Sequence, residues 1–157
     1  MRIENPWAKG IGGGAALAAV MLLAGCDTVN SLLPGLVSPP HFNPASLADM
    51  NTVQKDADSL FATLGVPGSC SYTANSAQFA QVDTDLTALL TQAGTVPNNN
   101  FTLKSATLLQ KGFDVFRDEA KSKDPVCLPQ IVVADKKSSF DNAVTNLISY
   151  ENAKPKG

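Results

Sequence analysis

Apolar residues recur at steps of three and four positions through most of the chain after residue 43. Four stretches share this rhythm, at about 44–64, 73–93, 101–123 and 129–152, and their main apolar positions are Leu47, Met50, Val53, Ala57, Leu60, Phe61, Leu64, Phe79, Val82, Leu86, Leu89, Leu90, Ala93, Phe101, Ala106, Leu109, Phe113, Phe116, Ala120, Phe140, Ala143, Val144, Leu147 and Ile148. Such spacing places side chains on one face of an α-helix, and no alternation is strong enough for a sheet. The pattern predicts four amphipathic helices and an all-α fold.

Capping residues locate the ends of the first helix. The sequence favours a start near Asn43 or Ser46, with Pro44 suited to a first-turn position and Ser46-x-x-Asp49 resembling a capping box. Gly65 follows the last apolar position, as expected of a helix-terminating glycine. We therefore expect this helix to end at residue 64.

Turn residues separate the remaining helices. Gly94 is the expected end of the second helix, and residues 97–100 (Pro-Asn-Asn-Asn) are expected to form a turn with a cap for the third. Asp-Pro at 124–125 ends the third helix, and Pro129 opens the fourth. We expect residues from 152 onward to fray.

Short connections between these helices favour an antiparallel four-helix bundle in up-down-up-down order. In that order the first and third connections lie at one end, and the start of the first helix lies at the other. We therefore expect a bundle domain over residues 44–152, followed by a disordered tail over 153–157.

The first 25 residues have a different pattern from the rest. A short polar start contains Arg2 and Lys9, and residues 10–25 carry no charge. A positive start, an apolar run and small residues at its end are typical of a secretory signal peptide. About 15 helical residues reach roughly 22 Å, which is too short for a bilayer core of about 30 Å. We expect residues 1–25 to be removed.

The apolar run ends in Leu23-Ala24-Gly25-Cys26. These four residues resemble the lipobox of bacterial lipoproteins, with Leu23 at the aliphatic position, two small residues next, and Cys26 as the lipid acceptor. The resemblance covers residues 1–26 and implies a diacylglyceryl thioether on Cys26, cleavage before it, and acylation of the new amino terminus. Several acyl chains hold a protein on a membrane, because each buried methylene contributes about 0.8 kcal/mol. A plain secretory signal with a chance cysteine is the alternative.

A tether over residues 26–43 joins the lipidated cysteine to the bundle. Asp27 resembles the signal that retains lipoproteins in the inner membrane of enteric bacteria, although an ordinary linker aspartate explains it equally well, so inner and outer membrane both stay open. Pro and Gly punctuate the tether, which favours extended conformations. Its apolar stretch at 32–37 suits contact with the membrane, with the domain or with a partner.

Charge and length limit the function classes. Removing residues 1–25 takes away Arg2, Lys9 and Glu4, which leaves 132 residues with 10 basic and 13 acidic side chains, a net charge of −3. This length suffices for one domain with a modest core. The charge is not basic enough to indicate a nucleic-acid partner.

Two cysteines remain once Cys26 carries lipid. An even number in an exported protein favours a disulfide, here between Cys70 and Cys127. Two free thiols or a metal pair are the alternatives, but a metal pair lacks further ligands. Because Cys70 lies in the first connection and Cys127 in the third, the bundle order brings them to the same end.

Catalytic, metal or cofactor motifs are not evident. The single histidine, His41, lies in the tether, and no Gly-rich phosphate loop follows the signal segment. Carboxylates close in sequence are Asp56 with Asp58, Asp83 with Asp85, and Asp114 with Asp118 and Glu119. Residues two apart lie about 200° apart on a helix, so the first two pairs diverge. Asp114 and Asp118 share a polar face with lysines, which indicates a solvated surface.

The aromatic residues follow the helix pattern. The phenylalanines at core spacing are Phe61, Phe79, Phe113, Phe116 and Phe140. Tyr72 and Tyr150 are the aromatics most free to meet a partner, although packing at the bundle ends explains them as well. The mature chain has no tryptophan, because Trp7 lies in the signal segment.

These observations favour a non-enzymatic adaptor, a lipid-anchored helical module that positions another envelope protein. The architecture is similar to that of secretin pilotins, small helical lipoproteins with a disulfide between connections, although no pilotin motif aligns. One alternative is an apolar ligand-binding lipoprotein with a cavity near Phe61, Phe79 or Phe113. Another is an exclusion or immunity lipoprotein of a mobile element.

Overall fold

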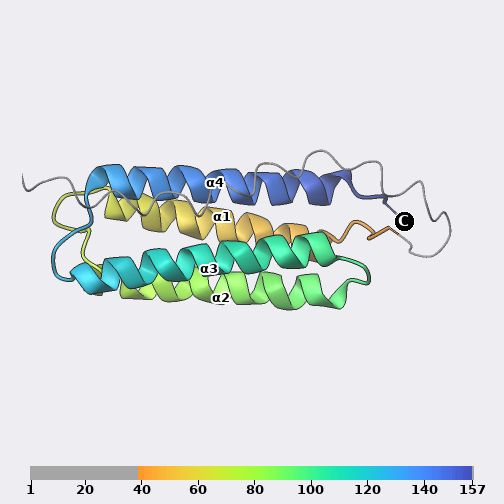
Figure 1. The fold of residues 1–157 in the computed structure, drawn as a ribbon, viewed down its shortest axis with the longest axis horizontal. Coiled ribbons are helices and arrows are strands. Elements are labelled where there is room, and N and C mark those ends of the chain that lie inside the picture. Colours follow the sequence, from red (N-terminus) through yellow and green to blue (C-terminus); the bar gives the residue numbers. More distant parts are fainter. Residues whose placement is uncertain (1–38, 157) are drawn as a thin grey trace, which may run out of the picture. The chain divides into compact units, whose positions relative to one another are not determined.

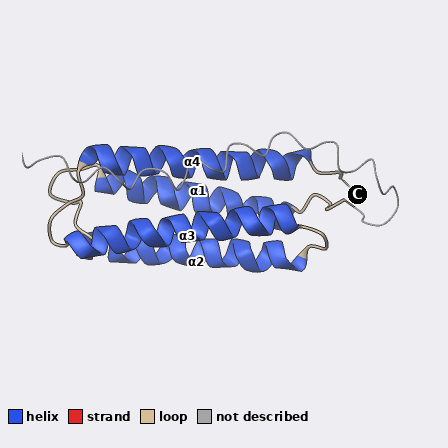
Figure 2. Cartoon of the chain, viewed as in Figure 1, coloured by secondary structure: helices blue, strands red, loops and turns tan. Residues whose placement is uncertain are grey.

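The described part of the chain, residues 39–156 of a computed structural model, forms an all-helical domain (Figures 1 and 2). Its elements are α1 (Pro44–Leu64), the short 3-10 turn η2 (Thr73–Asn75), α2 (Ser76–Thr95), α3 (Asn100–Lys123) and α4 (Gln130–Ala153). Residues 39–156 contain no strand. The predicted all-α class and the four predicted helices are confirmed.

The helices pack as an antiparallel bundle. α1 packs against α2 and α4, and α3 packs against the same two helices, so α1 and α3 lie diagonally opposite. The α1–α2 and α3–α4 connections lie together at one end (Figure 1), which we call the disulfide end. The α2–α3 turn and the start of α1 lie at the other, which we call the tether end. This arrangement is the predicted up-down-up-down order.

The core lies along the bundle axis and consists of the apolar faces of all four helices. Its largest fully buried apolar side chains are Phe79, Phe113, Met50, Leu60, Leu64, Leu86, Leu89, Val53, Val82 and Val144. Each large apolar side chain that is fully buried contributes about 1.5–3 kcal/mol. The periodic apolar positions in the sequence are therefore what hold the four helices together.

The cap of α1 differs from the predicted capping box. The side-chain oxygen of Asn43 accepts hydrogen bonds from the backbone N–H groups of Ala45 (2.9 Å) and Ser46 (3.1 Å), and Pro44 occupies the first turn. Ser46 is fully buried, and its hydroxyl makes no hydrogen bond within the described residues. The start at Asn43 is confirmed, and the Ser46–Asp49 box is wrong because packing draws Ser46 into the bundle.

The two predicted glycine stops have different outcomes. α1 ends at Leu64, directly before Gly65, although Gly65 has a φ of −73° and does not adopt the left-handed conformation of a helix-ending glycine. α2 continues through Gly94 and ends at Thr95, where Val96 becomes extended with a ψ of 120°. Pro97 explains this end, because a residue that precedes proline is disfavoured in the helical conformation. Gly94 is therefore not the stop.

The end of the chain is more ordered than predicted. α4 continues through Ala153, and the Lys154 side chain beyond it is buried. The backbone N–H of Phe42 donates a 3.0 Å hydrogen bond to the carbonyl of Pro155. The expectation that the tail frays from residue 152 is wrong for residues 152–155, because Lys154 has polar partners inside the bundle.

Candidate functional site

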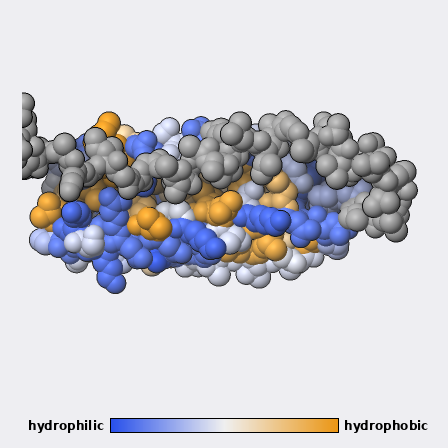
Figure 3. Space-filling model, in the orientation of Figure 1, coloured by the Kyte–Doolittle hydropathy of each residue, from blue (hydrophilic) through white to orange (hydrophobic). Residues whose placement is uncertain are grey.

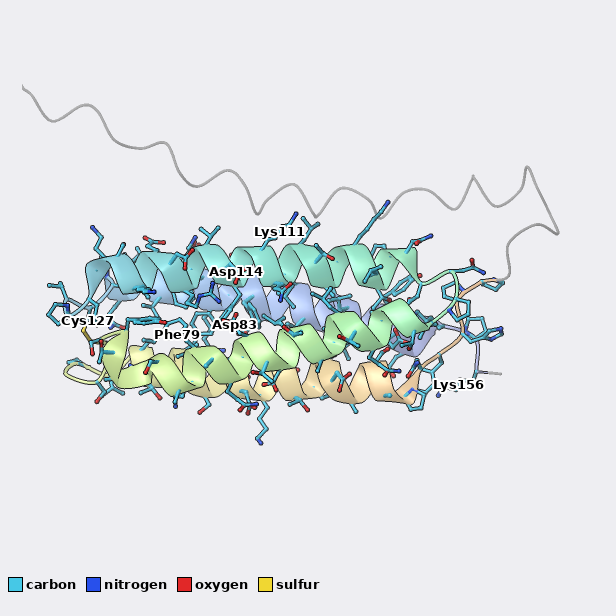
Figure 4. All side chains as sticks on the ribbon, turned by 90° about the horizontal axis from the view of Figure 1, so that it is seen from below. Phe79, Asp83, Lys111, Asp114, Cys127 and Lys156 are labelled. Atoms are coloured by element: carbon cyan, nitrogen blue, oxygen red, sulfur yellow. A yellow bond between two sulfur atoms is a disulfide. The ribbon has the colours of Figure 1, made fainter. Side chains whose placement is uncertain are left out.

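The predicted disulfide is present at one end of the bundle. The Cα atoms of Cys70 and Cys127 lie 5.3 Å apart, within the usual range, and the bond links residues 57 positions apart. Figure 4 shows Cys127 at the end opposite Lys156. The bridge closes for the predicted reason, because the first and third connections share an end.

Hydrogen bonds reinforce the same connections. Asp124 accepts a 3.0 Å bond from the backbone N–H of Thr73 and a 2.6 Å bond from its hydroxyl. These bonds hold the pKa of Asp124 below its usual value. Gln130 donates from its side-chain amide to the carbonyl of Leu64 at 3.1 Å. The loops at the disulfide end are thus fixed by covalent and polar contacts together.

Three large apolar side chains stay exposed at this end. Val66, Val126 and Ile131 are 50%, 69% and 78% exposed, and they belong to the two bridged connections and the first turn of α4. We call these three residues the distal patch. The β-branched run Ile131-Val132-Val133 gives no sequence signal for this exposure, since Val133 is buried while Ile131 is not. Apolar side chains left exposed on a fixed surface are suited to contact with a partner.

A buried polar cluster holds the tether end. The ammonium group of Lys154 donates to Glu151 at 2.5 Å, to the Asn99 side chain at 2.7 Å and to the Thr102 hydroxyl at 3.2 Å. The second carboxylate oxygen of Glu151 accepts from the backbone N–H of Asn43 at 2.8 Å. Glu151 is fully buried, and Lys154 is 6% exposed. The cluster therefore joins the end of α4 to the α2–α3 turn, to α3 and to the residue that enters α1.

Aromatic rings surround this polar cluster. The rings of Phe101 and Tyr150 lie 4.3 Å apart between centroids, and the Lys154 ammonium group lies 5.2 Å from the Tyr150 ring centroid. The ammonium group of Lys156 lies 5.4 Å from the ring centroid of Phe42. Tyr150 thus packs at a bundle end, as one of the two sequence interpretations expected. Tyr72 does the same at the disulfide end, where it contacts Phe79.

The neighbouring carboxylates diverge as predicted. Asp58 reaches Lys137 on α4, and Asp83 reaches Arg117 on α3, so each pairs with a different helix. Lys137 also pairs with Asp141 at 2.6 Å, and its hydrogen bonds to Asp141 and Asp58 raise its pKa. These ion pairs connect α1 to α4 and α2 to α3. They are structural contacts between helices.

On the acidic face of α3, Arg117 is the cation that pairs with the neighbouring carboxylates. Arg117 contacts Asp114 at 3.0 Å and Asp118 at 3.5 Å in addition to Asp83. Figure 4 shows Asp83 and Asp114 close together where α2 meets α3. Asp114 and Asp118 keep 42% and 70% of their side-chain surface exposed, which confirms the predicted solvated face. The sequence interpretation emphasised the lysines, whereas Arg117 makes these contacts.

Two carboxylates from different predicted pairs converge between α1 and α2. Burial raises the pKa of Asp85, the carboxylates of Asp56 and Asp49 raise it further, and a 2.9 Å hydrogen bond from Gln81 opposes the shift. Asp85 is 8% exposed. Sequence spacing gave no signal for this pairing, because it depends on the register between two helices.

A surface hollow of about 110 Å³ adjoins these carboxylates. It is lined by Asp56, Ser59, Gln78 and Gln81. Between residues 39 and 156, no group of three or more His, Cys, Asp or Glu side chains is placed to hold a metal ion. The hollow offers one carboxylate, two side-chain amides and the hydroxyl of Ser59. These side chains are suited to proton binding and hydrogen bonding.

The five phenylalanines predicted for the core contact one another. Ring centroids lie 5.1 Å apart for Phe61 and Phe116, 5.9 Å for Phe79 and Phe113, and 6.0 Å for Phe113 and Phe140. All five are buried. The core assignment is confirmed, and these rings pack against one another.

The predicted anchor lies outside the described residues. This applies to the lipobox residues Leu23, Ala24 and Gly25, to Cys26 and to the sorting candidate Asp27. Within residues 39–156, no helix has an apolar stretch long enough to cross a bilayer. His41 is exposed near the start of the described chain.

Comparison of the chain with protein-family models, curated proteins and solved structures gives no match. Function is therefore inferred from the sequence pattern and from the geometry of the two bundle ends.

Proposed function

We propose that this chain is a lipid-anchored protein of the bacterial cell envelope that acts as a non-enzymatic interaction module. Lipid on Cys26 would hold it at the membrane, with the bundle facing the periplasm. The bundle would present its distal patch to another envelope protein. Whether the inner or the outer membrane holds the lipid is left open by Asp27.

The observation that carries this proposal is that the chain enters the bundle at one end, while the distal patch lies at the other. The chain from Cys26 enters the bundle at Asn43, at the tether end, whereas Val66, Val126 and Ile131 lie at the disulfide end. The disulfide and the Asp124 hydrogen bonds fix the loops that carry the patch. A fixed apolar surface at the end opposite the start of α1 is suited to a partner in the periplasm, because little entropy is lost when it binds.

The ligand-binding alternative has less support. It calls for an apolar cavity near Phe61, Phe79 or Phe113, and these rings pack against other core rings. The hollow between α1 and α2 is lined by polar side chains instead. We therefore favour a protein partner.

The anchor is tested by replacing the lipid acceptor. We expect Cys26→Ala to abolish lipid labelling and to move the bundle out of the lipidated membrane fraction. The measurement is metabolic labelling with a fatty-acid analogue, followed by membrane fractionation. A Cys26→Ala protein that still incorporates the label would contradict the anchor.

The partner is tested by crosslinking in cells, affinity purification from solubilised membranes and mass spectrometry. We expect one envelope protein at near-stoichiometric yield, and we expect Ile131→Glu to remove it. The matched control is Thr145→Glu, which adds the same charge at another exposed position of α4. Recovery of the bundle alone, or equal recovery with both variants, would contradict a stable adaptor that uses the distal patch.

A further inference from the structure

Side-chain charge is divided unequally between the two ends. We divide each helix at its midpoint and assign the loops to the nearer end. The tether half then comprises residues 39–54, 86–111 and 142–156, with Lys104, Lys111, Lys154 and Lys156 against Asp49 and Glu151, a net charge of +2. The disulfide half comprises residues 55–85 and 112–141, with 6 basic and 10 acidic side chains, a net charge of −4. The end at which the chain enters α1 is the positive one.

The first turns of α3 carry apolar and basic residues on one outward face. Phe101, Lys104, Leu108 and Lys111 follow at steps of three and four, and all four are exposed. Phe101 and Leu108 keep 48% and 51% of their surface in solvent. Figure 4 shows Lys111 pointing away from the bundle, and hydrophobic patches interrupt the hydrophilic surface over α3 in Figure 3. Lysines beside exposed apolar side chains are typical of helices that lie at a membrane surface.

The bundle end adjoining this face has the same chemistry. The tilted rings of Phe101 and Tyr150 contact each other, and the Lys156 ammonium group lies over the Phe42 ring. The one buried carboxylate here, Glu151, is neutralised by Lys154, so it adds no net charge to the surface. Aromatic rings with nearby lysines are the residues that membrane–water interfaces favour.

We propose that Phe101, Lys104, Leu108, Lys111 and Lys156 form a membrane seat, a surface that rests on anionic phospholipid headgroups. The proposal builds on the proposed function, because the lipid on Cys26 must bring the bundle to the bilayer. The occupant follows from charge complementarity and from the path of the chain, since the tether that leads to Cys26 enters at this end. The seat is an additional contact of the folded domain itself.

The charge asymmetry gives the seated bundle an orientation. A lysine near an anionic membrane surface changes the ratio of bound to free states by about fivefold. α3 has 24 residues and is about 36 Å long, whereas electrostatic attraction to a surface is screened within about 8 Å at physiological salt. The anionic surface therefore attracts the positive tether half and scarcely reaches the negative disulfide half. The distal patch stays away from the bilayer and open to a partner.

The test uses the purified lipidated protein in vesicles with acyl-brominated lipids, which quench tryptophan at the membrane surface. Because the mature chain lacks tryptophan, Phe101→Trp is a unique reporter for the seat, and Ile131→Trp is its matched control at the disulfide end. The vesicles contain phosphatidylcholine with or without about 30% phosphatidylglycerol. We expect quenching of the residue-101 reporter to rise at least about twofold with the anionic lipid, and that of the residue-131 reporter to stay unchanged.

A second pair of variants tests the lysines. We expect Lys104→Gln with Lys111→Gln to lower the seated-to-unseated ratio by about 25-fold, at about fivefold for each lysine. The matched control is Lys121→Gln with Lys123→Gln at the disulfide end of α3, which should leave quenching unchanged. Equal effects of the two double variants would overturn the proposal.

Three other outcomes would also overturn it. Equal quenching of the residue-101 reporter in both vesicle types would show that anionic lipid is not the occupant. A concentration-dependent shift of its emission in detergent, without vesicles, would identify a second copy as the occupant. A protein that floats with the vesicles while both reporters stay unquenched would remove the seat and keep the anchor, whereas a protein that does not float would refute the anchor itself.

Discussion

The two ends of this bundle are held together by different kinds of interaction. At the disulfide end a covalent bond joins Cys70 to Cys127, and large apolar side chains stay exposed around it. At the tether end a buried ion pair, Glu151 with Lys154, gathers polar groups from three other segments. The disulfide end thus has a covalent bond in addition to its hydrogen bonds, whereas the tether end depends on a buried ion pair and its hydrogen bonds.

The two kinds of interaction differ in how strongly stability depends on the surrounding side chains. A disulfide stabilises mainly by restricting the unfolded chain, so it tolerates an exposed surface around it. A buried ion pair is costly to desolvate, and it is favourable only when every partner is in place. The stability of the tether end is therefore sensitive to the loss of a single side chain of the cluster. The exposed side chains of the disulfide end can be replaced at little cost to stability.

The largest expected effect comes from breaking the ion pair. Lys154→Met should lower the free energy of unfolding by about 3–5 kcal/mol, because it leaves the Glu151 carboxylate buried without its cation. Denaturant unfolding at neutral pH measures the loss. Lys156→Met is the matched control, since that lysine is exposed, and it should change stability by less than about 0.5 kcal/mol. Equal losses in both variants would mean that the buried cluster contributes no more to stability than an exposed lysine does.

Breaking the disulfide should have a comparable effect. Cys127→Ser should cost about 4 kcal/mol, from the entropy that the 57-residue separation gives back to the unfolded chain. Denaturant unfolding of the variant, and of the wild type with and without reductant, measures it. The double variant Cys70→Ser with Cys127→Ser should match the single variant. A loss below about 1 kcal/mol would show that packing alone holds this end.

A smaller effect is expected at the entry to α1. Asn43→Ala removes the side-chain oxygen that caps the helix and should cost about 1 kcal/mol. Asn43→Asp retains the acceptor and should keep most of the stability, while the backbone bond to Glu151 persists in both variants. If the aspartate variant were as unstable as the alanine variant, the loss would have to come from another contact.

The smallest effect lies midway between the ends, at Asp85. Its folded pKa is raised above 3.8, so its contribution to stability is complete below pH 3.8 and falls as the pH rises through the folded pKa. Asp85→Asn should therefore gain stability at pH 7, by about 0.5 kcal/mol, the low end for a hydrogen bond, and gain little near pH 3. Thermal unfolding between these pH values measures it. Asp118→Asn, at an exposed site, should show no such pH-dependent gain.

Much of the fold was predictable, because helix periodicity and cysteine placement are local or topological signals. The four helices and the Cys70–Cys127 bridge follow from them. The errors arose where tertiary packing decides between local signals. Ser46 has the residue type of a cap, yet it is buried, and Asn43 makes the capping bonds instead. Gly94 has the residue type of a stop, yet Pro97 sets the end of α2.

The candidate sites were less predictable. The contacts of Lys154 with Asn99 and Thr102 join residues 55 and 52 positions apart, and the bond from Asn43 to Glu151 spans 108. Such contacts leave no spacing pattern in one sequence, because they depend on which helix ends meet. The exposure of Ile131 was equally hidden, since its neighbour Val133 is of the same chemical type and is buried.

The hydrogen bond from Phe42 to Pro155 brings the beginning and the end of the described chain together. A reporter protein or affinity tag fused behind Lys156 would therefore sit beside the residues that lead into α1. The exposed loop around Pro67 and Gly68, at the opposite end, also accepts an insertion, but a tag there would adjoin Val66 and cover the distal patch. Gly68 already adopts a φ of 86° there, so the flanking residues of an insert should include glycine.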